Sequence, residues 1–157
     1  MGVGKVIDPS LSWDDLAWVR SLSTLPLVLK GILHPLEAAM AVEHGVDGLV
    51  GSNHGGRQLD RVPASIDALA PVVDAVDGRA EVYLDGGIRA GTDVITALAL
   101  GARAVFIGWP YVFALAAGGE PTVALCFDML MRELRDAMAQ SGARTIEELA
   151  ADMVLDR

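Results

Sequence analysis

The chain has 157 residues, a length that suits one domain with a sizeable core. Its formal net charge of −9, without a basic stripe, argues against nucleic acid as a partner. The single cysteine, Cys126, excludes an intrachain disulfide and a cysteine metal cluster, and the histidines have no companions at metal-ligand spacing.

Short apolar runs alternate with helical patterns along the chain. Strands are predicted at residues 27–30, 48–51, 81–84 and 104–107. Helices are predicted at residues 13–23, 35–44, 65–76, 91–100, 122–140 and 145–154. Ser12 is the predicted N-cap of the first helix. Strands that alternate with helices predict right-handed βαβ units and a parallel sheet.

The second strand is followed by the run SNHGGRQLD, residues 52–60. His54 can move a proton near neutral pH, and Arg57 can hold a carboxylate with two parallel hydrogen bonds. The two glycines between them let the backbone approach a ligand closely. The run therefore predicts a site for a small anionic substrate. The alternative is a loop histidine without a role and a surface arginine paired with Asp60.

The third strand is followed by LDGGIRAGT, residues 84–92. A strand, a glycine turn and a helix N-terminus together favour a phosphate, because free N–H groups and the helix dipole attract an anion. The alternative is a tight turn in which Asp85 only caps the helix. Lys30, at the end of the first strand, needs an anionic partner if it lies at the inner mouth of the sheet. Otherwise it extends to solvent.

Four segments occur in one order and at one spacing: LVLKGI, SNHGGRQLD, LDGGIRAGTDVITALALGARAVFIG and PYVFALAAGGE. From about Leu11 to Leu155 the chain resembles the C-terminal half of the FMN-dependent α-hydroxy-acid oxidase and dehydrogenase family. That family includes glycolate oxidase, lactate oxidase, lactate monooxygenase and mandelate dehydrogenase. The resemblance implies an α/β fold whose parallel (β/α) units are strands five to eight of a TIM barrel, followed by C-terminal helices. It makes residues 1–157 one partial domain.

The resemblance also implies a reaction, in which FMN serves to oxidise a small 2-hydroxy acid, such as lactate, glycolate or mandelate, to the 2-oxo acid. His54 would accept the proton and bind the substrate, with Arg57 on its carboxylate. Lys30 would stabilise the negative charge of reduced flavin. The resemblance further implies that FMN is bound by Ser52, Asp85, Gly86, Gly87, Ile88, Arg89, Gly108 and Trp109. Every one of these motifs falls at the carboxyl end of a strand, where such barrels carry their chemistry.

The chain departs from the family in two respects. The family usually has Gly-Arg-Pro where this chain has Gly108-Trp109-Pro110, and tryptophan cannot supply the arginine's charge to a phosphate. The family's first four strands have no counterpart here, and a lone half-barrel exposes two strand edges and an apolar inner face. The alternative is therefore a non-catalytic or split half-barrel that needs self-association or a partner half-barrel. Another phosphate-binding barrel enzyme is a third possibility, which the intact SNHGGRQLD run disfavours.

Neither a membrane nor an export pathway is indicated. The longest uncharged apolar stretch, residues 104–119, is shorter than the roughly 18 residues of a membrane span. The first residues, Met1–Lys5, lack the apolar region of a signal peptide. We therefore expect a cytoplasmic protein without a membrane partner.

Overall fold

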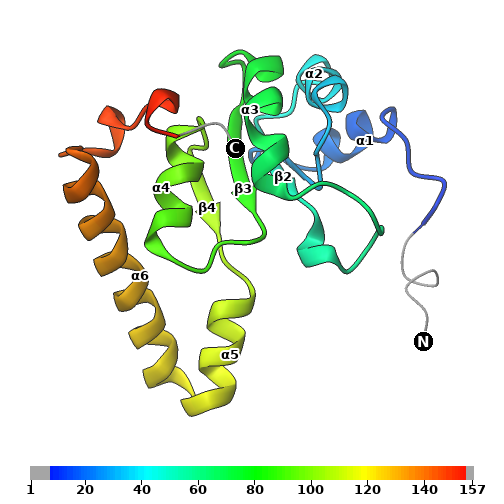
Figure 1. The fold of residues 1–157 in the computed structure, drawn as a ribbon. Helices are drawn as coiled ribbons and strands as arrows, with labels where there is room; N and C mark the ends of the chain where they lie inside the picture. Colours follow the sequence, from blue (N-terminus) through cyan, green and yellow to red (C-terminus); the bar gives the residue numbers. More distant parts are fainter. Residues whose placement is uncertain (1–7, 155–157) are drawn as a thin grey trace.

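The computed structural model describes residues 8–154, which fold around a four-stranded parallel sheet (Figure 1). The strands are β1 (Val28–Lys30), β2 (Gly48–Ser52), β3 (Glu81–Asp85) and β4 (Ala104–Phe106), and they lie side by side in that order. The helices are α1 (Asp15–Leu22), α2 (Pro35–Glu43), α3 (Ser65–Val76), α4 (Gly91–Ala99), α5 (Trp109–Gly118) and α6 (Glu120–Ser141). Short 3-10 turns lie at η2 (His54–Gly56), η3 (Ile146–Glu148) and η4 (Ala151–Met153). The predicted α/β class, with parallel βα units, is confirmed. Met1–Lys5 and Leu155 lie outside the described residues.

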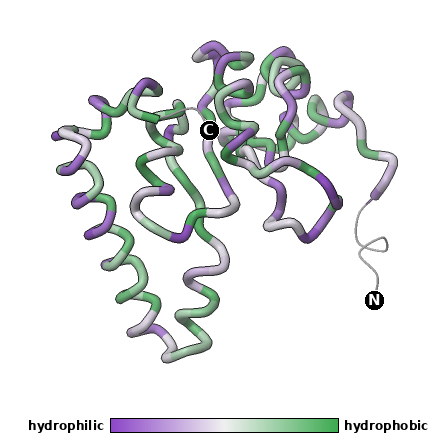
Figure 2. The backbone as a smooth tube through the Cα atoms, viewed as in Figure 1, coloured by the Kyte–Doolittle hydropathy of each residue, from purple (hydrophilic) through white to green (hydrophobic). Residues whose placement is uncertain are grey.

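The core lies between the sheet and the helices α2, α3 and α4. In α3 the buried positions recur every three or four residues, at Ser65, Ala68, Leu69, Val72 and Val76, which places them on one face of the helix. Alternate strand residues meet this face, and Leu49 and Leu84 are fully buried there. Hydrophobic residues accordingly run through the centre of the sheet (Figure 2).

The opposite face of the sheet is open and of mixed character. Register and alternation place Val28 and Lys30 of β1 on this face, with Tyr83 of β3 and Phe106 of β4. Val28 and Phe106 lie on the two edge strands and are 43% and 50% exposed. The expected inner face is therefore only partly apolar, because charged Lys30 shares it with Asp85.

The helices α5 and α6 form a hairpin that projects from the sheet (Figure 1). The Thr122 hydroxyl donates to the carbonyl of Ala114 at 2.7 Å and ties the two helices together. None of the α5 residues is buried, although the sequence of this helix is apolar throughout, and Phe113 is 63% exposed. Within residues 8–154, every helix is too short or too polar to cross a lipid bilayer.

Two local predictions were wrong, and one helix was missed. Ser12 does not cap α1, because its hydroxyl donates to the Asp15 carboxylate at 3.0 Å instead of accepting from the helix. The helix α5 was not predicted, since a segment that is apolar all round has no amphipathic period. Residues 145–154 form the turns η3 and η4, separated by extended residues, instead of one helix.

Candidate functional site

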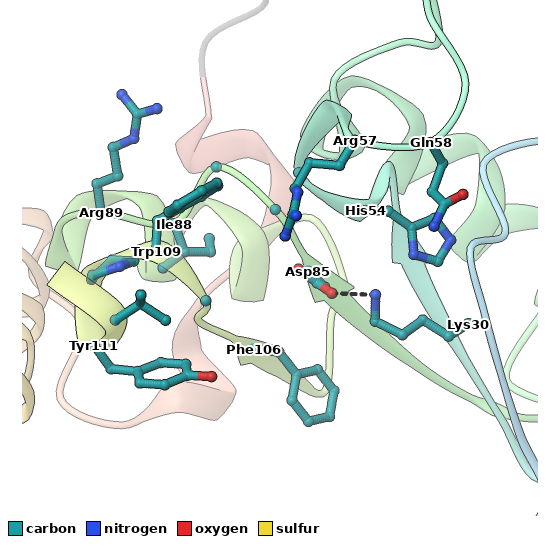
Figure 3. A pocket seen from close by; sticks show the side chains of 16 residues that line it. Lys30, His54, Arg57, Gln58, Asp85, Ile88, Arg89, Phe106, Trp109 and Tyr111 are labelled. Atoms are coloured by element: carbon teal, nitrogen blue, oxygen red, sulfur yellow. Dashed lines mark ion pairs between the residues drawn. The ribbon is translucent and has the colours of Figure 1, made fainter. Parts of the chain in front are cut away.

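A cavity of about 560 Å³ opens at the carboxyl ends of the strands (Figure 3). Because the strands are parallel, the segments that follow them meet at one edge of the sheet. The cavity brings together most of the predicted residues: Lys30, His54, Arg57, Asp85, Gly86, Gly87, Ile88, Arg89, Gly108 and Trp109. Ser52 is not among the lining residues but lies buried beneath them, 1% exposed. Sequence reasoning missed other lining residues, among them Gln58, Phe106 and Tyr111.

A buried serine connects the ends of three strands. Lys30 Nζ lies 2.5 Å from Asp85 Oδ2, and the two side chains point toward one another (Figure 3). The Ser52 hydroxyl accepts from Lys30 Nζ at 2.9 Å and donates to Asp85 Oδ2 at 3.1 Å. It also accepts from the backbone N–H of His54 at 3.1 Å. The lysine thus has the anionic partner that its position requires, and Asp85 pairs across the sheet instead of capping a helix.

His54 begins the turn η2 and is separated from β2 by Asn53. Its φ of 55° lies in the left-handed region, which is uncommon for a residue other than glycine. The side chain of Asn53 accepts from Gly55 N at 3.0 Å and stabilises the turn. A Cβ at Gly31 would lie 2.8 Å from His54 Nε2, so a larger residue at this position would displace the imidazole. Gly31 is therefore a supporting residue that sequence reasoning missed, although a glycine directly after Lys30 was a visible signal.

Arg57 reaches from the end of η2 toward the cavity (Figure 3). The alternative pairing with Asp60 is not among the ion pairs of residues 8–154. The Arg57 guanidinium carbon instead lies over the indole of Trp109, 5.9 Å from the ring centroid. The structure thus brings Arg57 and Trp109 together across 52 positions of sequence.

The glycine turn after β3 leaves backbone open to the cavity, but the start of α4 is already capped. Asp93 accepts from the N–H groups of Arg89 and Ala90 at 2.8 and 2.9 Å. Glu133 of α6 accepts from Gly91 N at 2.9 Å. These three donors are therefore not free for a phosphate, contrary to the simple helix N-terminus argument. Gly87 is exposed, has a φ of 82°, and has no atom within 4 Å of the position its Cβ would take.

The charges around the cavity favour an anion. Three cationic side chains, of Lys30, Arg57 and Arg89, line the cavity with one carboxylate, that of Asp85. The Arg89 side chain points away from the other labelled residues (Figure 3) and also borders a second cavity of about 210 Å³ at α6. Within residues 8–154 no three histidine, cysteine or acidic side chains are grouped as a metal site would need.

The open face of the sheet holds one perturbed ionisable group. Tyr83 donates a hydrogen bond to the Glu81 carboxylate, and this bond raises the pKa of the phenol above its ordinary value of 10.0. Tyr83 also meets Phe106 edge to face, with ring centroids 5.9 Å apart. The phenol therefore stays neutral at physiological pH.

Comparison with known proteins decides the family. The model of the FMN-dependent dehydrogenase family matches residues 2–156. The chain belongs to the FMN-dependent dehydrogenase family. The predicted resemblance is thus confirmed, and the cofactor of this family is FMN.

Among curated relatives of this FMN-dependent dehydrogenase chain, 2-hydroxyacid oxidase 1 of Mus musculus is 54% identical over 152 residues. That match covers 97% of this chain and 41% of the relative. Glycolate oxidase of Spinacia oleracea is 52% identical, over 94% of this chain and 40% of the relative. A crystal structure of mandelate oxidase with (S)-2-phenylpropionate superposes with a TM-score of 0.86 at 45% identity, over 90% of this chain and 42% of that one. The chain thus spans about two fifths of the length of these relatives.

Proposed function

We propose that this chain carries the proton-transfer and carboxylate-binding residues of an FMN-dependent oxidase of small 2-hydroxy acids. One observation carries the proposal: a single cavity at the strand ends is lined by His54, Arg57, Lys30 and the Asp85–Arg89 turn. Oxidation of a 2-hydroxy acid needs a base, a carboxylate clamp and a cation beside an open glycine turn. The relatives named 2-hydroxyacid oxidase and glycolate oxidase support that substrate class.

The residues present fit FMN. A cavity of about 560 Å³ lies within the range of roughly 300–1,000 Å³ that is typical of ligand sites. Positions Gly87 and Gly108 have no atom within 4 Å of where a Cβ would lie, so a phosphate could approach the backbone there. We assign the turn from Asp85 to Arg89, with Gly108 and Trp109, to the ribityl-phosphate end. Lys30 belongs to the flavin ring end, and the buried Ser52 supports it from beneath.

The chain's own residues perform three tasks in this proposal. Arg57 binds the substrate carboxylate and so fixes the α-carbon next to His54. His54 accepts a proton from the substrate. Lys30 stabilises negative charge at the flavin end of the cavity, and its contacts with Ser52 and Asp85 hold the ammonium there. FMN, when bound, takes up the two electrons that leave the substrate.

We further propose that β1 to β4 correspond to strands five to eight of a (β/α)₈ barrel within one partial domain. This assignment is supported by the open sheet face, by the position of β1 and β4 at the edges of the sheet, and by relatives more than twice as long. The uncovered face would then be completed by four further strands.

A second candidate function follows from the open face of the sheet. This chain would be a half-barrel without turnover of its own, which associates with another copy or with a partner half-barrel. The exposed apolar side chains of Val28, Phe106 and Phe113 favour association.

An anaerobic spectral titration tests the proposal. The purified chain is incubated with FMN, and lactate, glycolate or mandelate is then added while the flavin absorbance is followed. Bleaching of bound flavin by one of these acids is the expected result, and His54→Ala should abolish it while FMN still binds. His34→Asn is the matched control, because asparagine keeps the helix cap that His34 provides to α2.

Bound flavin that no acid bleaches would favour the second candidate. Retained bleaching in His54→Ala would contradict the assignment of the base, and a chain that does not bind FMN would contradict the proposed cofactor site. Light scattering on the same sample measures association directly. A strict monomer that turns over would contradict the half-barrel assignment.

A further inference from the structure

Trp109 stands where the family usually has an arginine, and it contacts two elements of the site at once. It is the first residue of α5, and its indole stacks with Phe113 one turn later, with centroids 5.3 Å apart and ring planes 20° apart. The Arg57 guanidinium carbon lies over the ring at 5.9 Å. The indole nitrogen also lies against η2, 3.4 Å from where a Cβ at Gly55 would stand. The tryptophan thus connects α5 to the turn that carries His54 and Arg57.

The arginine would otherwise have little to orient it. Arg57 is exposed and follows a short 3-10 turn, and it takes part in none of the ion pairs found within residues 8–154. A long side chain that is free in solution loses rotamer entropy when it binds a ligand, and this loss weakens binding. An arginine already held in place avoids part of that cost.

An aromatic face can hold a guanidinium without using up its hydrogen bonds. The planar group stacks on the ring through its face, while the N–H groups project from its edge. Those edge donors are the ones that grip a carboxylate in the two-bond geometry. The contact with the Trp109 ring is therefore compatible with carboxylate binding, whereas a carboxylate partner in the protein would compete with the substrate.

We propose that Trp109 is a positioning residue, which holds the Arg57 guanidinium ready for the carboxylate of the substrate. The inference rests on the proposed role of Arg57 as the clamp. Compared with the arginine usual in the family, Trp109 offers no charge to a phosphate but supports the carboxylate site. Loss of the ring should weaken carboxylate binding by about two- to five-fold, the effect of one exposed cation–π contact.

Nuclear magnetic resonance on the full chain tests the contact. An indole ring shifts the signals of protons above its face, so the side-chain protons of Arg57 should resonate upfield and show cross-relaxation with the Trp109 ring. Arg57→Lys assigns these signals. In Trp109→Leu they should return to ordinary positions, while Trp109→Phe should keep most of the shift. Ordinary Arg57 shifts in the wild type, without cross-relaxation to the indole, would overturn the proposal without any variant.

Lactate titration, followed by the same signals, tests the consequence. The dissociation constant should rise in Trp109→Leu and be largely restored in Trp109→Phe. Equal affinity of wild type and Trp109→Leu would overturn the positioning role even where the contact is present. The test of the contact needs neither flavin nor turnover, so its failure is distinct from failure of the proposed oxidase function. Lack of any binding of lactate, glycolate and mandelate by the wild type would overturn both.

Discussion

The Ser52 hydroxyl joins three strand ends, and its removal is a direct measure of what holds the site together. Ser52→Ala deletes a bond from Lys30 Nζ and a bond to Asp85, both with a charged partner, and the neutral bond from His54 N. Each such bond contributes roughly 1.5–3 kcal/mol. The Lys30–Asp85 contact at 2.5 Å survives, and the lysine side chain is 45% exposed, so water replaces one of the lost partners. We therefore expect the free energy of unfolding to fall by about 2 kcal/mol, close to one charged bond.

Urea unfolding followed by circular dichroism measures this change. With a slope of about 2 kcal/mol/M, the midpoint should fall by about 1 M while the slope stays constant. Ser141→Ala is the control, because that exposed hydroxyl bonds only to carbonyls of its own helix, those of Ala137 and Met138. The control should change stability by no more than about 0.5 kcal/mol. Equal midpoints for the two variants would refute the claim that Ser52 stabilises the strand ends.

Three further perturbations test other parts of the account. Gly31→Ala should displace the His54 ring, because its Cβ would lie 2.8 Å from Nε2. Gly45→Ala, also at a positive φ but in open space, should cost about 1–2 kcal/mol of strain and leave the ring in place, and unchanged His54 ring signals in Gly31→Ala would contradict the packing argument. A hydrogen bond from Leu27 N and the Arg20 guanidinium hold the pKa of Asp47 below its ordinary value of 3.8. The stability that Asp47 contributes is therefore complete above pH 3.8 and is lost as the pH falls through the lower, folded-state pKa. The melting temperatures of the wild type and Asp47→Asn should differ at pH 7 and converge in acid. A difference in melting temperature that stays constant with pH would contradict this. Trp109→Arg should raise FMN affinity roughly ten- to a hundred-fold, as one added charge-assisted bond would, and unchanged affinity in a fluorescence titration would show that the missing arginine is not what limits binding.

The strands and most helices could be predicted because their signals are local. The helix α3 begins and ends where its spacing of apolar residues indicates, and short apolar runs next to glycine identify β2 and β3. Each of these two strands extends one residue further than predicted, to Ser52 and Asp85. Both polar residues remain in the ladder because they pair with each other across it, which no local pattern reveals.

The site could be predicted as a set of residues but not as a set of contacts. The motif pattern identified His54 and Arg57, and the parallel topology explains why they share a cavity with Lys30. The contact of Arg57 with Trp109 depends on where α5 begins, and that helix has no amphipathic signal. Likewise, the capping of α4 by Glu133 requires α6 to pack beside it.

Equilibrium titration of FMN against the wild type, Gly87→Ala and Gly78→Ala tests the central claim most directly. Both glycines have a positive φ and no atom within 4 Å of the Cβ position, so the two substitutions impose similar strain, but only Gly87 lines the cavity. The wild type and Gly78→Ala should bind one FMN per chain. Gly87→Ala should bind it roughly ten- to a hundred-fold more weakly, which corresponds to one lost charge-assisted bond. Equal affinity of the two variants, or no saturable binding by the wild type, would contradict a flavin site at the ends of these strands.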